Sequence, residues 1–219
     1  VTAAPGFVAA GVAAGIKPSG NPDLSLVATA DGLPVAAAGV FTRNKMTAAP
    51  VITTRAHLEA TDGHAVAVVL NSGNANAATG QQGLDDAEAM CETVATELGV
   101  DASQVLVCST GLIGIPMPID VIKAGIPSVV AARSADGGQA AATAIMTTDT
   151  VAKQVVIDGA GFVVGGMAKG AAMLSPNMAT MLAVLTTDAA ATPQQLKAAL
   201  VYGVADSFNA LDVDGCTST

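Results

Sequence analysis

Short apolar runs interrupted by turn residues occupy the first third of the chain. The runs at residues 7–16, 24–30 and 35–41 are separated by Lys-Pro-Ser-Gly-Asn-Pro and Asp-Gly-Leu-Pro segments. Because glycine and proline interrupt regular structure, this pattern predicts three short strands in antiparallel arrangement. Residues 65–70 form an almost continuous apolar run, which is typical of a strand covered on both faces.

Helical spacing appears in the middle of the chain. Apolar side chains recur at helical intervals from residue 84 to residue 98, and Gly99 is a suitable C-terminal stop. Cys91 lies on the apolar face of this predicted helix, so we expect its thiol to be buried. Residues 118–148 predict three further helical pieces with glycine-rich joints, at 118–124, 127–133 and 138–146.

The second half of the chain returns to strands. Residues 104–108 predict a buried strand, and residues 153–157 and 162–167 predict a hairpin around Asp-Gly-Ala-Gly. We expect another strand at 180–185. A helix is then predicted to begin at Thr192-Pro193-Gln194-Gln195, whose first and last residues suit a capping box. Strands interspersed with helices favour one layered α/β domain with a mixed sheet.

Composition narrows the class of protein. Hydrophobic residues make up 51% of the 219 positions, but no apolar run reaches the roughly 18 residues of a membrane span, so the sequence predicts a soluble protein. A net charge of −9, one tyrosine and no tryptophan argue against a nucleic-acid surface. Cys91, Cys108 and Cys216 have no CxxC spacing, so we expect buried, reduced thiols of a cytosolic protein and no metal site.

The stretch from Gly165 to Leu182 holds the strongest candidate for chemistry. An apolar run that contains Lys169 leads into Ser175-Pro176-Asn177, and Ala179-Thr180 precedes a second apolar run, so the pattern is strand, turn, strand. If the Thr180 hydroxyl attacked the Ala179 carbonyl, an N-to-O acyl shift and hydrolysis would leave Thr180 as a new N-terminus. Its free α-amine, with a pKa of about 7.7 to 8, would then serve as its own base.

Four other polar features each allow two interpretations. Thr110-Gly111 follows the strand at 104–108 and can offer an O–H and an N–H to one oxyanion, or can simply form a turn. Lys169 is an isolated cation suited to an α-carboxylate, or a surface residue. The Asn-Ser-Gly-Asn-Ala-Asn segment at 71–76 either satisfies its own backbone or lies near a substrate. Thr147-Thr148-Asp149 either ends a helix or contacts a substrate. Neither a Gly-x-Ser-x-Gly elbow nor a glycine-rich phosphate loop is present.

The residues around Thr180 resemble a known family. Met167-Ala168-Lys169-Gly170, followed by Met173, Pro176 and Met178-Ala179-Thr180-Met181-Leu182, is similar to the self-cleaving threonine motif of the ornithine acetyltransferases, or glutamate N-acetyltransferases, of arginine biosynthesis. Four more stretches agree with the family in order along the chain: 39–44, 71–76, 108–114 and 144–149.

The resemblance implies a particular chemistry. Autocleavage between Ala179 and Thr180 would expose the nucleophile, which would carry an acetyl group from N-acetylornithine to glutamate without a cofactor. The family pattern leaves open whether acetyl-CoA is also a donor. The expected site residues are Thr110 and Gly111 as the oxyanion hole, Thr180 as the nucleophile, and Thr147, Lys169 and Thr180 as substrate contacts.

The resemblance also implies an architecture. The expected fold is a mixed-sheet sandwich with helices outside, of the self-processing N-terminal-nucleophile-like type. Residues 1–179 would form an alpha chain and residues 180–219 the start of a beta chain, assembled as a cytoplasmic heterotetramer of two alpha and two beta chains. We expect only small-molecule substrates, with no nucleic-acid or membrane partner. Because the chain ends inside a motif that is central in the family, we expect that the C-terminal half is absent.

Two other functions stay open from the sequence. A related self-cleaving aminopeptidase would share the architecture, although such enzymes typically use serine where this chain has Thr180. An inactive fragment would act only as a binding or assembly module. Ala172 stands where the family usually has glycine, and we expect strain in the turn if that position needs a positive φ.

Overall fold

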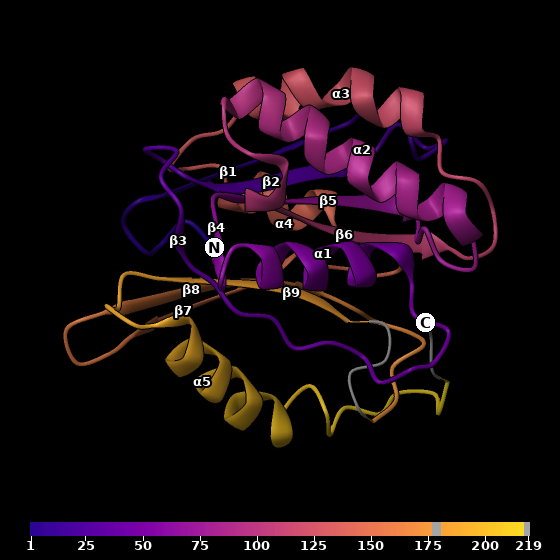
Figure 1. Ribbon diagram of the computed structural model, residues 1–219. Coiled ribbons are helices and arrows are strands. Elements are labelled where there is room, and N and C mark those ends of the chain that lie inside the picture. The colour runs from indigo at the N-terminus through magenta and orange to yellow at the C-terminus, as the bar shows by residue number, and fades with distance from the viewer. Residues whose placement is uncertain (177–180, 217–219) are drawn as a thin grey trace.

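The computed structural model describes residues 1–176 and 181–216 (Figure 1). The predicted cleavage pair, Ala179 and Thr180, lies outside the described residues. Two main sheets and their helices stack in layers, which confirms the predicted layered α/β class. The larger sheet has the strand order β1-β2-β5-β6, with bounds β1 (Phe7–Val12), β2 (Leu24–Thr29), β5 (Ala67–Asn74) and β6 (Val105–Leu112).

This sheet is mixed, as the sequence predicted. β2 pairs antiparallel with both β1 and β5, whereas β5 and β6 are parallel. β5 continues to Asn74, four residues beyond the predicted end at Leu70, so four of the six residues of the asparagine-rich segment at 71–76 are strand. β6 likewise continues through Thr110 and Gly111. The parallel pairing therefore places the C-terminal ends of these two strands side by side.

Two helices cover one face of this sheet (Figure 1): α2 (Gly80–Leu98) and α3 (Ile119–Ala131). α2 is followed by Gly99 in a left-handed conformation with φ of 72°, and Cys91 on the buried face of this helix is fully buried, as predicted. A short 3₁₀ turn, η1 (Ala102–Gln104), connects α2 to β6.

The prediction of two separate helical pieces at 118–124 and 127–133 was wrong, because α3 is continuous with Pro127 inside it. Proline removes one helical hydrogen bond. Here Ile122, Ile126 and Val129 bury one face of the helix in the core, and that burial offsets the loss. Gly125 permits the close packing, since a Cβ there would lie 2.6 Å from the Cβ of Ala14.

The second sheet contains β7 (Lys153–Asp158), β8 (Val163–Lys169) and β9 (Leu182–Thr187), all antiparallel. The predicted hairpin is confirmed, and so are the two strands of the strand-turn-strand pattern, although β9 begins at Leu182 and the part of the predicted turn from Asn177 to Thr180 lies outside the described residues. α4 (Gly138–Ala144) contacts β1 and β2 of the first sheet and β7 and β8 of the second. The prediction that all helices lie outside was therefore wrong for α4. Its small side chains, Ala141 and Ala142, let both sheets pack closely against it.

The segment from residue 35 to residue 65 differs most from the prediction. The third strand is only two residues long, β3 (Val35–Ala36), and it pairs with β4 (His64–Ala65). Between them lies α1 (Ala49–Ala60), which the sequence did not reveal because Val51-Ile52-Thr53-Thr54 is a β-branched run. Tertiary contacts with β6 hold this segment helical, and Pro50 fits its first turn.

α1 covers the exposed edge of β6. The Thr54 hydroxyl donates to the Val107 carbonyl at 2.7 Å, and it accepts the Val107 N–H at 3.0 Å. A ring nitrogen of His57, Nδ1, lies 2.7 Å from the Val105 carbonyl. These contacts satisfy backbone groups that an edge strand leaves unpaired.

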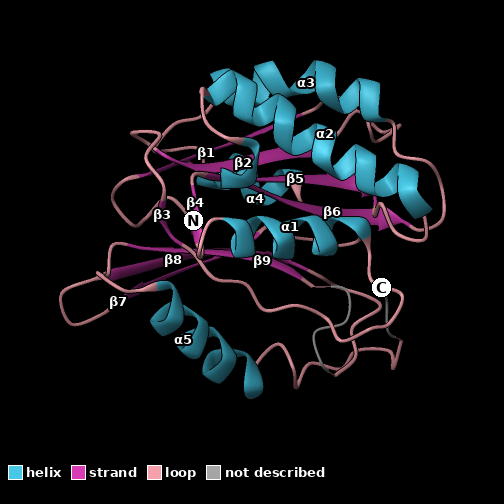
Figure 2. Cartoon of the chain, in the orientation of Figure 1, coloured by secondary structure: helices cyan, strands magenta, loops and turns pink. Residues whose placement is uncertain are grey.

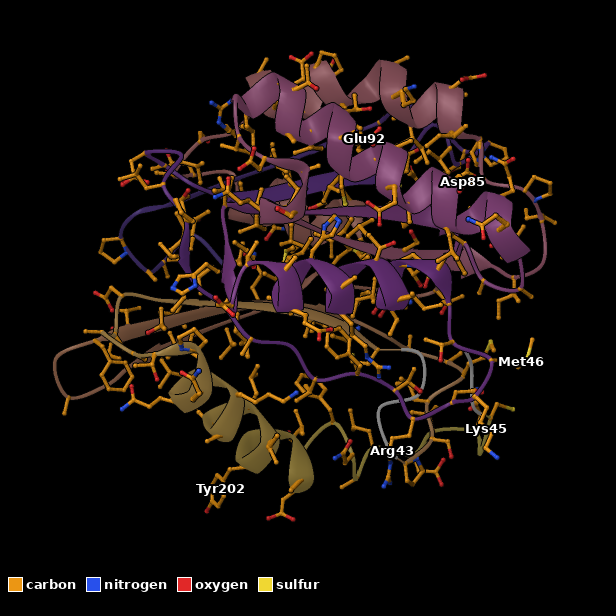
Figure 3. The ribbon with its side chains drawn as sticks, viewed as in Figure 1. Arg43, Lys45, Met46, Asp85, Glu92 and Tyr202 are labelled. Atoms are coloured by element: carbon orange, nitrogen blue, oxygen red, sulfur yellow. The ribbon has the colours of Figure 1, made fainter. Side chains whose placement is uncertain are left out.

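α5 (Pro193–Ala205) lies below the second sheet in Figure 2, on the side away from α2 and α3. Its predicted capping box is confirmed: the Thr192 hydroxyl accepts the N–H of Gln195 at 3.2 Å, and the Gln195 side chain accepts the N–H of Thr192 at 2.9 Å. Tyr202 points outward from this helix (Figure 3). None of the described helices is long and apolar enough to cross a membrane.

The prediction that all three cysteine thiols are buried was wrong for Cys216. Cys91 is buried and Cys108 is half-buried, but Cys216 is exposed. Cys216 follows Asp214 and Gly215 beyond α5, in a segment with too few apolar side chains to fold inward. All three are free thiols in the structure.

Candidate active site

Thr110 and Gly111 lie near the C-terminal end of β6, beside the matching end of β5. Ser72 pairs with Thr110 and Gly73 pairs with Gly111 in the parallel register. The carboxyl ends of parallel strands are a usual place for ligand-binding groups in α/β proteins. The tertiary structure thus gives these two residues a position suited to a site.

The backbone at Gly111 admits only glycine. Its φ is +138°, and a Cβ there would lie 2.3 Å from the carbonyl carbon of Gly73 and 2.5 Å from the nitrogen of Asn74. Gly111 is nevertheless exposed to solvent. A ligand atom can therefore approach the Gly111 backbone closely, as an oxyanion hole requires.

Lys169 reaches Thr110 from the other sheet. It is the last residue of β8, where it pairs with Leu182 of β9, and its Nζ donates to Thr110 Oγ1 at 3.0 Å. Lys169 is only 2% exposed and Thr110 only 6% exposed. Burial lowers the pKa of Lys169 from its ordinary value, although the nearby carboxylate of Asp149 opposes this effect. The interpretation of Lys169 as a surface residue was therefore wrong.

Asp149 connects the two segments that carry Thr147 and Lys169. One carboxylate oxygen accepts the N–H of Gly170 at 2.8 Å, and the other accepts the N–H of Thr147 at 3.2 Å. Lys153 donates to the first oxygen as well. Burial alone would raise the pKa of Asp149, but Lys153 and the two backbone N–H groups hold it below its ordinary value.

Lys17 and Ser72 fix the end of α4 that leads into Thr147. The Lys17 ammonium donates to the Met146 carbonyl at 2.8 Å, and the Ser72 hydroxyl donates to the Ala144 carbonyl at 2.5 Å. The loop that carries Lys17 is held by Asp23, which is fully buried. The Asp23 carboxylate accepts the N–H groups of residues 14–17 at 2.6 to 3.2 Å. The loop after α4 is therefore held from both sides.

The asparagine-rich segment mainly satisfies backbone groups. Asn71 donates to the Asn74 carbonyl at 2.9 Å, and Asn74 donates to the Pro116 carbonyl at 3.0 Å. Asn76 donates to the Gly83 carbonyl at 2.8 Å. The Asn74 bond fixes the loop that follows Gly111, and the other two satisfy carbonyls of the segment itself and of α2, which supports the structural alternative for residues 71–76.

The structure thus brings together most of the site residues that the sequence analysis named. Thr110 contacts Lys169 directly, Gly111 is adjacent, and Thr147 is joined to this group through Asp149. Thr147 itself is exposed. The expected strain at Ala172 is absent, because Ala172 has no positive φ; among the described residues of this turn, the non-glycine residue with positive φ is Met173, at 54°.

Asp149, Lys17 and Lys153 contribute contacts that sequence reasoning did not assign. A weak signal for Asp149 and Lys153 was available, since they are four positions apart. Lys17 gave no signal, because it is 129 positions from the carbonyl that it contacts.

Elsewhere, Arg43, Phe41 and Lys197 line a separate hollow of about 280 Å³ beside α5. Figure 3 shows Arg43, Lys45 and Met46 at the outer surface, away from Asp85 and Glu92 on α2. Within residues 1–176 and 181–216, no three His, Cys, Asp or Glu side chains are grouped to hold a metal ion.

The fold and this strand-end site define a layered α/β protein with a buried polar site where its two sheets meet. The crystal structure of ornithine acetyltransferase complexed with ornithine from Mycobacterium tuberculosis is 48% identical, with a TM-score of 0.73, and the match covers 85% of this chain and 95% of that chain. The structure of arginine biosynthesis bifunctional protein ArgJ from Bacillus halodurans is 36% identical, with a TM-score of 0.70, over 83% of this chain and 94% of that chain.

The chain belongs to the ArgJ family, which it matches over residues 8–219. Arginine biosynthesis bifunctional protein ArgJ from Streptomyces avermitilis is 52% identical over all of this chain and 56% of that protein. The Mycobacterium leprae protein of the same description is 53% identical over all of this chain and 55% of that protein. The chain therefore spans about half the length of the curated relatives it matches.

Proposed function

We propose that this chain carries the acetyl-transfer site of an ArgJ enzyme of arginine biosynthesis. The observation that carries the proposal is the buried contact between Lys169 and Thr110, with Gly111 beside it at the end of β6. It gathers a hydroxyl, an approachable backbone and a cation at one point. These groups can bind an amino-acid derivative and stabilise an oxyanion.

The nucleophile is created by cleavage in this proposal. The Thr180 Oγ attacks the Ala179 carbonyl, the peptide C–N bond breaks, and an ester joins the two residues. Water then hydrolyses the ester, which leaves a carboxylate on Ala179 and a free α-amine on Thr180. Residues 1–179 and the chain that begins at Thr180 are the two products.

Acetyl transfer follows by double displacement. The α-amine of Thr180 takes the proton from its own Oγ, and this oxygen attacks the acetyl carbonyl of N-acetylornithine. Thr110 and Gly111 stabilise the oxyanion, the C–N bond breaks, and the amine of ornithine leaves with the proton. The α-amine of glutamate then attacks the acetyl ester, and the proton it loses returns to Oγ. Thr147 and Lys169 hold the substrates, with Lys169 facing the α-carboxylate.

The relatives support this assignment. The Streptomyces and Mycobacterium leprae proteins are described as bifunctional in arginine biosynthesis, and the solved Mycobacterium tuberculosis enzyme binds ornithine. Both solved chains align over a larger share of themselves than of this chain, so they are shorter, whereas the curated relatives are longer. The short length of the solved chains relative to the curated proteins fits a precursor that is cleaved into two chains. We further propose two copies of each piece, a cytoplasmic location, and acetyl-CoA as a second donor.

Intact-mass measurement and an acetyl-transfer assay on the protein as its gene encodes it test the proposal. We expect two masses that meet between Ala179 and Thr180, one uncut mass for Thr180→Ala, and transfer of labelled acetyl from N-acetylornithine to glutamate. Release of amines from a panel of peptide amides would instead identify an aminopeptidase. A single uncut wild-type mass without transfer would identify a binding or assembly module, and an uncut protein that still transfers acetyl would overturn the mechanism.

A further inference from the structure

The contact between Lys169 and Thr110 determines where the Thr110 hydroxyl hydrogen can point. A lysine ammonium has only donors, so the Thr110 oxygen accepts in this 3.0 Å hydrogen bond. Among residues 1–176 and 181–216, no group accepts a hydrogen bond from the Thr110 hydroxyl in turn. The O–H of Thr110 is therefore left free to donate to a bound ligand.

We propose that Lys169 is a positioning residue for the oxyanion hole: its ammonium holds the Thr110 oxygen so that the Thr110 O–H donates to the developing oxyanion. This inference rests on the acetyl-transfer function proposed above and adds a role to the expected carboxylate contact. An ammonium has three N–H groups. One serves Thr110, and no group in the described part of the chain accepts from the other two, which can serve a substrate carboxylate.

The surroundings strengthen this hydrogen bond. Both partners are buried, and a charged donor in a site of low dielectric polarises the hydroxyl that it contacts. Burial lowers the pKa of Lys169; Asp149 acts against this, and Lys153 and Lys17 add to it. A less basic ammonium is a stronger hydrogen-bond donor, so the same cluster that surrounds Lys169 favours its action on Thr110.

The two roles of Lys169 respond differently to the substrate. A contact with an α-carboxylate matters only for substrates that have one. An effect through Thr110 matters for every acyl group that passes through a tetrahedral oxyanion at this site. An activated ester without a carboxylate, p-nitrophenyl acetate, therefore isolates the second role.

The test measures the acetylation burst of the processed enzyme with p-nitrophenyl acetate for wild type, Lys169→Met, Thr110→Val and the double variant. We expect Thr110→Val to slow the burst about 100-fold, as loss of one oxyanion donor does, and Lys169→Met to slow it about tenfold. The double variant should be no slower than Thr110→Val alone, because Lys169 acts through the lost hydroxyl. A Lys169→Met burst equal to wild type, or effects that multiply in the double variant, would overturn the proposal.

Thr110→Ser and Lys123→Met are the matched controls. Thr110→Ser keeps the hydroxyl, so its burst should still fall about tenfold when Lys169→Met is added. Lys123 is exposed on α3 and makes the same side-chain change without touching the site, so its burst should equal that of wild type. Intact mass and thermal unfolding of every variant confirm that each is processed and folded.

A pH profile provides a second measurement that needs no change at Lys169. The charged groups facing this ammonium are Asp149, Lys153 and Lys17. The wild-type burst rate should fall as pH rises through the lowered pKa of Lys169, and this fall should be missing in the nearly isosteric Thr110→Val. An identical alkaline fall in both would contradict the proposal. A normal burst without acetyl transfer from N-acetylornithine to glutamate would refute the proposed function, whereas a wild-type burst in Lys169→Met, with acetyl transfer by the wild-type enzyme intact, would refute this inference alone.

Discussion

The carboxylate of Asp149 accepts the backbone N–H of Gly170 at 2.8 Å, across 21 positions of sequence. Its other oxygen accepts the N–H of Thr147, so one buried side chain sets the distance between the loop after α4 and the end of β8. The site depends on this distance, because Lys169 immediately precedes Gly170.

Asp149→Asn should lower the free energy of unfolding by about 1–3 kcal/mol, because an amide cannot accept at both ends and loses the pair with Lys153. Urea unfolding at neutral pH measures this loss. Asp85→Asn is the control, since Asp85 is exposed on α2 (Figure 3) and should change stability by less than about 0.5 kcal/mol. Equal stability of Asp149→Asn and wild type would show that the carboxylate does not hold these segments together.

The same residue predicts a pH dependence. The pKa of Asp149 is lower in the folded state than in an unfolded chain, so its stabilisation is complete above the unfolded value of about 3.9 and is lost as pH falls through the lower folded value. Wild type should therefore lose stability faster than Asp149→Asn on acidification through this range. Urea unfolding series for the two proteins compare the slopes, and parallel slopes would contradict the assignment.

Thr54→Val should cost about 1–3 kcal/mol, because it leaves both the N–H and the C=O of Val107 without their partner at the edge of β6. Thr54→Ser retains the hydroxyl and should recover most of this loss. Chemical unfolding of wild type, Thr54→Val and Thr54→Ser measures the three free energies of unfolding. A Thr54→Val protein as stable as wild type would indicate that another group satisfies the strand edge.

Gly111→Ala should destabilise the chain by more than the roughly 1–3 kcal/mol of backbone strain, because its Cβ meets the backbone of Gly73. Gly203→Ala is the matched control, since a Cβ in that helical position meets nothing within 4 Å and should stabilise α5 by about 0.5–1 kcal/mol. Thermal unfolding measures both changes. A Gly111→Ala protein of wild-type stability would refute the steric argument.

Only one thiol should react quickly with 5,5′-dithiobis(2-nitrobenzoate) in the native chain. Cys216 is exposed, whereas burial raises the pKa of Cys91 and raises that of Cys108 to about 12, which keeps both protonated. Cys216→Ser should remove the fast phase, and denaturant should release two slow thiols in that variant. A fast phase that survives Cys216→Ser would contradict the low reactivity expected of Cys91 and Cys108.

Local signals predicted the elements whose own sequence dominates their structure. The α2 helix has a complete apolar stripe and a stop at Gly99, and α5 has its capping box at Thr192, so neither depended on distant contacts. α1 was missed because its β-branched residues favour a strand locally, while contacts of Thr54 and His57 with β6 decide for a helix. α3 was divided at Pro127 because the sequence does not show how much core that helix buries.

The sequence by itself determined the family, the layered α/β class and the identity of Thr110, Gly111, Thr147 and Lys169 as site candidates, because motif order and hydrophobic periodicity are written locally along the chain. Only the tertiary structure decided that Lys169 hydrogen-bonds to Thr110 and that Asp149 joins Thr147 to Gly170. Lys169 and Thr110 are 59 positions apart in the sequence, and Asp149 and Gly170 are 21 positions apart. Which distant polar groups meet is set by how the two sheets pack around α4, and no local pattern encodes that packing.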